Sequence, residues 1–120
     1  MKRRSNRVQT KGIVVMNSNE KPVVTIIYDI ALGGVSFFFA KEIVDFYDDF
    51  TMDILIYDSL TNFEYSITEI KGQLSSGIQM RDATGIGLIW RYGVEFLDMN
   101  SEQIVLLETL LHPVGKVRSI

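Results

Sequence analysis

A chain of 120 residues without cysteine has the size of one domain and excludes disulfides and thiolate metal sites. Apolar residues make up 47% and charged residues 22%, as in ordinary globular proteins, which argues against disorder. No run of about 18 apolar residues occurs, and no apolar segment of the signal-peptide type follows the charged start. We therefore expect a cytoplasmic protein that does not insert into a membrane.

Charge is distributed unevenly along the chain. The net charge is −3, but residues 1–11 hold five basic residues and no acidic one. The remaining chain has 7 basic and 15 acidic residues, a balance that argues against broad nucleic-acid binding. The sequence thus predicts a flexible cationic arm, residues 1–11, on an acidic body. An isolated arm of this kind is more often a solvated tail than a binding site.

Short runs of β-branched and aromatic residues, separated by turn-forming segments, predict an antiparallel sheet. The fourth run alternates with period two and places Met52, Ile54 and Ile56 on one face. The fifth run is less regular, because Gly72 interrupts it. These five expected strands lie at residues 12–16, 23–28, 35–39, 51–57 and 65–74.

The last strand has the clearest alternation in the chain. One of its faces is consistently apolar, and we expect this face to lie in the core. The residues of that face are Leu88, Trp90, Tyr92, Val94 and Phe96.

The pattern then changes to a helical one. Asn100 is suited to cap a helix, and Gln103, three residues later, can reach back to it. An apolar stripe at helical spacing follows, and His112-Pro113 ends it. The stripe consists of Ile104, Leu107 and Leu111. Together these patterns predict a mainly β protein, a small antiparallel barrel with one C-terminal helix.

Catalytic residues are not recognisable in the sequence. His112 is the only histidine, and no Ser–His–Asp or HExxH spacing and no acid–base pair is present, so we expect no enzymatic activity. The aromatic residues at 37–39 predict core packing rather than a stacking surface. One acidic cluster lacks the spacing and the glycine of a calcium loop, which predicts a solvated loop: Asp45, Asp48, Asp49 and Asp53.

The turn from Asp29 to Gly34 is a candidate binding element. Gly33 and Gly34 allow positive φ and a close backbone approach to a ligand, and Asp29 places a carboxylate beside that opening. On its own the pattern is more often structural, because Asp and Gly suit any turn.

Several motifs occur together at a fixed separation. Arg3 and Arg7 have the RxxxR spacing, Asp29-x-Ala31-x-x-Gly34 begins 22 residues after Arg7, and residues 92–98 read YGVEFLD. In this combination the chain resembles the PilZ domain family over essentially its whole length. The motifs of that family are RxxxR and [DN]xSxxG. The resemblance implies a small six-stranded antiparallel β-barrel with a C-terminal α-helix in a single domain, divided into arm, barrel and helix at 1–11, 12–98 and 100–112.

The resemblance also implies a ligand, cyclic di-GMP, and no cofactor. This ligand has two phosphates and two guanines, so its receptor needs arginines for phosphate and acceptors for guanine N–H groups. The arginines of the arm match the family's arginines, Asp29 matches its guanine acceptor and Gly34 its final glycine. The ligand-binding residues implied in this way are Arg3, Arg4, Arg7, Asp29, Ala31, Gly33 and Gly34.

One position departs from the family pattern. Ala31 stands where the family has serine, so a hydroxyl that would contact the ligand is missing. A net contribution of about 0.5–1.5 kcal/mol per hydrogen bond corresponds to a loss of up to about tenfold in affinity. Binding is weakened by such a change but not abolished.

Three interpretations remain open. In the first, cyclic di-GMP orders the arm and re-presents a surface to an unidentified protein partner in motility, pilus or polysaccharide regulation. In the second, the domain has lost the nucleotide and acts as an adaptor through protein contacts. In the third, a small barrel binds single-stranded nucleic acid; the acidic body argues against this one, so we expect no nucleic-acid partner.

Overall fold

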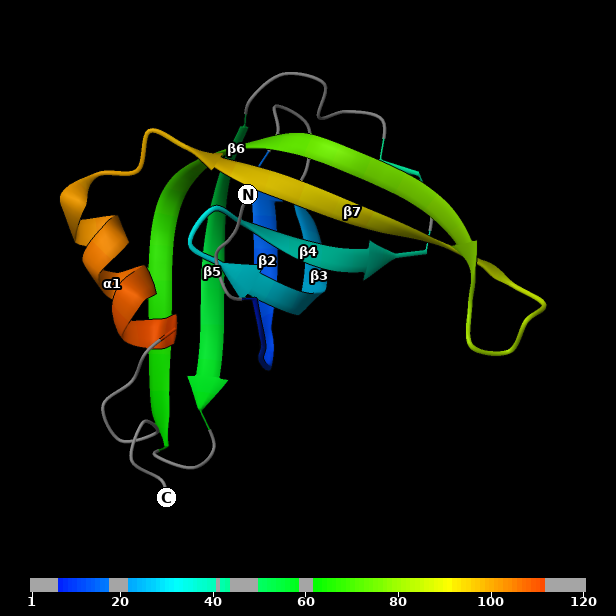
Figure 1. Ribbon diagram of the computed structural model, residues 1–120, viewed down its shortest axis with the longest axis horizontal. Helices are drawn as coiled ribbons and strands as arrows, with labels where there is room; N and C mark the ends of the chain where they lie inside the picture. The colour runs from blue at the N-terminus through cyan, green and yellow to red at the C-terminus, as the bar shows by residue number, and fades with distance from the viewer. Residues whose placement is uncertain (1–6, 18–21, 41, 44–49, 59–61, 112–120) are drawn as a thin grey trace, which may run out of the picture.

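The computed structural model describes residues 7–17, 22–40, 42–43, 50–58 and 62–111. Within these residues the chain forms seven strands and one helix (Figure 1). Among them, no helix is long and apolar enough to cross a membrane. In chain order the elements are β1 (Val8–Gln9), β2 (Gly12–Asn17), β3 (Val23–Ala31), β4 (Gly34–Phe39), β5 (Phe50–Asp58), β6 (Phe63–Arg81), β7 (Leu88–Leu97) and α1 (Ser101–Leu111).

Six of these strands form a closed antiparallel barrel. They are hydrogen-bonded in the order β3–β2–β5–β6–β7–β4, and β4 pairs again with β3, which closes the ring. β1 is an additional strand on β3, with Val8 opposite Ile30 and Gln9 opposite Asp29. The mainly β fold with a six-stranded barrel and a C-terminal helix is thereby confirmed. β1 lies inside the segment expected as an arm, and two residues are too few for alternation to reveal a strand.

Side chains from alternate strand positions fill the barrel. Met52, Ile54 and Ile56 are 0%, 1% and 3% exposed, which confirms the face predicted for β5. Phe37 is also fully buried in the same core, as predicted for residues 37–39, whereas Phe38 is half-buried and outside the core, because adjacent strand residues face opposite ways.

β6 and β7 continue beyond the barrel as a two-stranded hairpin (Figure 1). β4 pairs with β7 only between Trp90 and Glu95, and β5 pairs with β6 only as far as Gly72. Leu88 therefore lies outside the barrel and is 54% exposed, whereas Tyr92 is buried. The prediction that Leu88 faces the core is wrong, because alternation defines a shared face but not where the barrel ends.

β6 is longer than the expected strand at residues 65–74. Gly72 does not interrupt it. Glycine is needed at this position because side chains from β5 and β7 occupy the space that a Cβ would take. The irregular alternation arises at Glu69, whose φ is 57° and whose N–H donates to the carboxylate of Asp53 (2.9 Å). A register shift at this level of the β5–β6 ladder changes which residues face inward, so period two fails across it.

α1 begins with the predicted capping box. The Asn100 N–H donates to Oε1 of Gln103 (3.0 Å), and the Gln103 N–H donates to Oδ1 of Asn100 (2.8 Å). Gln103 also donates from Nε2 to the carbonyl of Thr68 on β6 (2.8 Å), which turns it toward the barrel. Of the apolar stripe, Leu107 and Leu111 are buried, whereas Ile104 is 39% exposed. The buried residues of α1 are Gln103, Leu107, Leu110 and Leu111.

The two glycines after β3 give a matched test of this packing. A Cβ on Gly34 would collide with the carbonyl of Val94 on β7, whereas a Cβ on Gly33 would meet nothing within 4 Å. Gly34→Ala should lower the free energy of unfolding by about 1–3 kcal/mol. Gly33→Ala should leave it unchanged or raise it by up to about 1 kcal/mol. Urea unfolding followed by Trp90 fluorescence measures both, and equal effects would contradict the close approach of β4 to β7.

Candidate functional site

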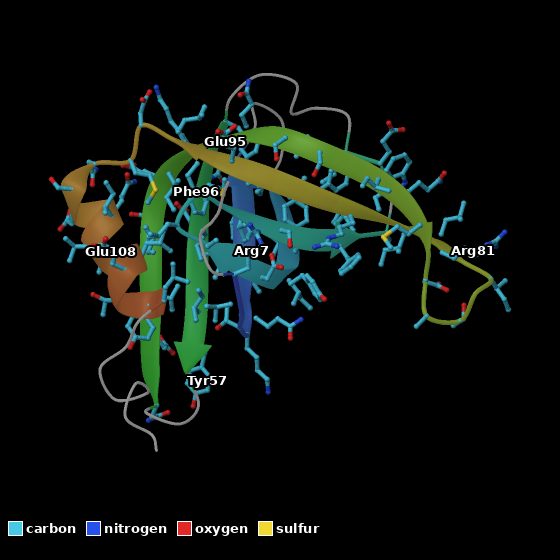
Figure 2. All side chains as sticks on the ribbon, viewed as in Figure 1. Arg7, Tyr57, Arg81, Glu95, Phe96 and Glu108 are labelled. Carbon is cyan, nitrogen blue, oxygen red and sulfur yellow. The ribbon has the colours of Figure 1, made fainter. Side chains whose placement is uncertain are left out.

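The carboxylate of Asp29 on β3 is the centre of the site. Arg7 donates to its Oδ1 from Nε (3.0 Å) and from Nη2 (2.8 Å), and Ser36 donates to the same oxygen from Oγ (2.5 Å). Asp29 and Ser36 are direct partners across the β3–β4 ladder. Arg7 immediately precedes β1, which pairs with β3, and it lies over the barrel near β3 and β4 (Figure 2).

This carboxylate is largely buried and ionised. The side chain of Asp29 is 10% exposed and that of Arg7 is 45% exposed. Burial raises the pKa of Asp29, but the hydrogen bonds from Arg7 and Ser36 and the charges of Arg7 and Arg91 outweigh burial and hold the pKa below its usual value. Among the described residues, none donates a hydrogen bond to the second oxygen, Oδ2, so this atom is available as an acceptor.

A pocket of about 400 Å³ lies beside the carboxylate, over β4, β6 and β7. Gly93 of β7 forms part of its lining, and a Cβ there would crowd Oγ of Ser76, so glycine keeps this part of the pocket open. Besides Tyr92, whose hydroxyl accepts from the Ile43 N–H, the polar side chains of the lining are two cations, one carboxylate and three serine hydroxyls: Arg7, Arg91, Glu95, Ser36, Ser75 and Ser76.

The structure brings several predicted ligand-binding residues together. Asp29 does not itself line the pocket, but its carboxylate is bonded to Arg7 and Ser36, which do. Ala31 is 1% exposed and does not line the pocket. Arg3 and Arg4 lie outside the described residues. The predicted residues that line the pocket are Arg7, Gly33 and Gly34.

The glycine turn has a different physical role from the expected one. Neither Gly33 nor Gly34 has a positive φ, so the left-handed backbone expected there is not observed. Glycine is needed at position 34 because β7 approaches closely, and the Phe96 N–H donates to the carbonyl of Gly33 (2.9 Å). These contacts hold the turn against β7 at the rim of the pocket.

Two residues of the pocket are absent from the sequence-based set. Ser36 lies two positions after Gly34, and a tight turn between β3 and β4 would have placed it opposite Asp29. Arg91 is recognisable in the sequence only as an outward residue of the last strand. Its neighbours come from β3 and β4, which sequence alternation cannot identify.

Other candidate groups do not form a second site among the described residues. His112 and three of the four clustered acidic residues lie outside them. The fourth, Asp53, accepts the backbone hydrogen bond of Glu69. In the part of the chain that the structure describes, no group of three or more His, Cys, Asp or Glu side chains could hold a metal ion.

Asp29 should make the stability of the domain depend on pH. Its pKa falls on folding from about 3.8, so its stabilising effect is complete above that value and is lost as the pH drops through the lower folded-state pKa. The wild type should exceed Asp29→Asn in free energy of unfolding by about 1–3 kcal/mol at neutral pH. That difference should shrink in acid.

Urea unfolding of both proteins at neutral pH and in acid measures this difference. Glu108→Gln, on the outer face of α1 (Figure 2), is the control and should show no such effect. A difference between wild type and Asp29→Asn that stays constant with pH would contradict the charged contact.

A model described as the PilZ domain matches residues 1–112. None of the curated proteins matches the sequence.

Solved structures share the fold at low sequence identity. The complex of K. pneumonia MrkH with c-di-GMP (cyclic di-GMP) has a TM-score of 0.73 and 12% identity, over 98% of this chain and 55% of that one. The PilZ domain of YcgR from Escherichia coli with c-di-GMP has a TM-score of 0.68 and 16% identity, over 96% and 92%. The Bacillus subtilis inhibitor of motility MotI has a TM-score of 0.67 and 16% identity, over 98% and 54%. The chain thus spans about half the length of MrkH and MotI.

Proposed function

The chain belongs to the PilZ domain family, and on this basis we propose that it is a receptor domain that binds cyclic di-GMP without converting it. The observation that carries the proposal is the buried, ionised carboxylate of Asp29, fixed by Arg7 and Ser36 beside a polar pocket. Two of the similar structures, MrkH and YcgR, are complexes with this nucleotide.

The chemistry of the cluster matches both parts of the ligand. Oδ2 of Asp29 is free to accept the N1–H and N2–H groups of a guanine, which adenine lacks in that arrangement. Arg7 holds Oδ1 with two of its donors and keeps the remaining N–H groups for a phosphate. One arginine therefore positions the guanine acceptor and adds positive charge for the phosphate.

The coupling to a protein partner follows from the place of Arg7 in the chain. Arg7 joins residues 1–6 to β1, and β1 pairs with β3 at Asp29. A ligand that engages Arg7 and Asp29 acts directly on the segment that precedes β1, and ordering of this arm would re-present a surface to the partner. MotI is named as an inhibitor of motility and MrkH as a transcription regulatory factor, so outputs differ among the similar structures.

Ala31 favours a second function, that of an adaptor without nucleotide. The missing hydroxyl lowers the expected affinity, and Ala31 is buried rather than exposed to the pocket. Ser36 partly offsets this loss, because its hydroxyl bonds to Asp29 and lines the pocket. The two functions differ in one measurable property, which is binding of cyclic di-GMP.

Calorimetry with cyclic di-GMP and cyclic di-AMP tests the receptor. Wild type should prefer cyclic di-GMP, and Arg7→Ala should weaken its binding by about tenfold or more, because a charged contact and the fixing of Asp29 are both lost. Lys11→Ala is the matched control, since Lys11 is basic and close in sequence but does not line this pocket, and its backbone carbonyl accepts from the Tyr57 N–H. Equal losses of affinity in the two variants would indicate general charge attraction instead of a specific contact of Arg7.

Restoring the family's serine gives an independent test. Ala31→Ser restores the family's hydroxyl, and tightening of cyclic di-GMP binding by up to about tenfold would place that hydroxyl at the ligand although Ala31 is buried in the domain without ligand. The same calorimetric titration measures it, with thermal unfolding to confirm that the variant folds. Absence of binding by both wild type and Ala31→Ser at millimolar ligand would favour the adaptor.

A further inference from the structure

Aromatic rings hold the guanidinium of Arg91, the second arginine of the pocket. Its Cζ lies 5.2 Å from the centroid of the Tyr28 ring and 5.9 Å from that of Phe38. The two rings meet edge to face with their centroids 5.2 Å apart. Such cation–π contacts position a guanidinium over the ring faces without using its N–H donors.

The donors of Arg91 find no acceptor within the described part of the chain. No hydrogen bond or ion pair joins its guanidinium to any of those residues, whereas Arg7 gives two donors to Asp29. Arg91 is half-buried and lines the pocket. A fixed, partly desolvated guanidinium with its planar donors free is suited to bind an anion with two parallel hydrogen bonds.

We propose that Arg91 binds a phosphate of the ligand and that Tyr28 and Phe38 position its guanidinium for this contact. The inference rests on the proposed function, because the phosphate is that of cyclic di-GMP. A phosphate is favoured because the N–H donors of Arg91 have no acceptor among the described residues, while Tyr28 and Phe38 already pack against its guanidinium.

Arg91 belongs to the barrel and not to the arm. In β7 it is paired on one side with Phe38 of β4 and on the other with Ile78 of β6. Its position is therefore set by two ladders before any ligand arrives, while Arg7 precedes β1. One phosphate site is thus built into the barrel, and it does not depend on residues 1–6.

The one carboxylate among the lining residues, that of Glu95, limits where the phosphate can bind. Glu95 lies four positions along β7 from Arg91, about 13 Å away along the strand. Repulsion by its carboxylate disfavours a phosphate at that end. The phosphate consequently lies at the Arg91 end, and the Glu95 end is left for neutral or donor groups of the nucleotide.

Three arginine variants test the proposal by calorimetry with cyclic di-GMP. Arg91→Ala should weaken binding by about tenfold to a hundredfold, and Arg91→Lys should recover part of the loss because it keeps the charge but not the planar pair of donors. Arg81→Ala is the matched control. Arg81 lies at the far end of the same hairpin, outside the pocket, and donates to the carbonyl of Gly85 (Figure 2).

The positioning role of the rings has its own readout. Phe38→Leu keeps an apolar side chain but removes the ring, and we expect a smaller loss of affinity than for Arg91→Ala. Because Phe38 acts through Arg91, adding Phe38→Leu to Arg91→Ala should cause no further loss. Additive losses would show that Phe38 contributes independently of Arg91.

Phosphorus NMR distinguishes a phosphate contact from a contact with the base. In the wild-type complex a ligand phosphate should resonate away from its free position, and in the Arg91→Ala complex at saturating ligand one resonance should move back. If Arg91→Ala binds cyclic di-GMP within about twofold of the wild-type affinity, or if the phosphorus shifts do not change, the inference is overturned. The receptor function then still stands. Absence of wild-type binding would overturn both.

Discussion

The pairing of β3 with β4 is the constraint on which the barrel and the site both depend. One edge of β3 is shared by β2 and β1, and the other edge belongs to β4, which pairs in turn with β7. A register shift between Ile27 and Asp29 makes Ile27 and Ile30 both face the core, three positions apart instead of two. The extra residue, Tyr28, is thereby free to contact Arg91 outside the barrel. The β3–β4 ladder that closes the ring thus also sets Asp29 opposite Ser36 and places Tyr28 against Arg91.

The charge balance of the site limits how any ligand can bind. Asp29 is buried, and the donors that keep it ionised come from Arg7 and Ser36. Removing those donors without replacement would leave a buried charge unpaired, which costs several kcal/mol. A ligand must therefore either leave the Arg7 contact intact or supply N–H donors of its own. The edge of a guanine satisfies the second condition.

Local sequence patterns predicted much of the fold but less of the site. The alternation of Met52, Ile54 and Ile56 and the capping box of Asn100 with Gln103 involve neighbours in sequence, and both were recovered. The cluster of Arg91 with Tyr28 and Phe38 depends on register between strands far apart in the chain, and a register shift cannot be read from alternation. The length of β6 was underestimated for the same reason, since a register shift hides its period.

The hairpin formed by β6 and β7 separates the pocket wall from the core. Every residue from Ser75 to Arg81 is exposed, although Ser75, Ser76 and Ile78 line the pocket. Insertions or deletions at the turn of residues 82–87 would lengthen or shorten this hairpin without altering a buried contact of the barrel. A change in hairpin length would therefore reshape one wall of the pocket while leaving the buried contacts of the barrel in place.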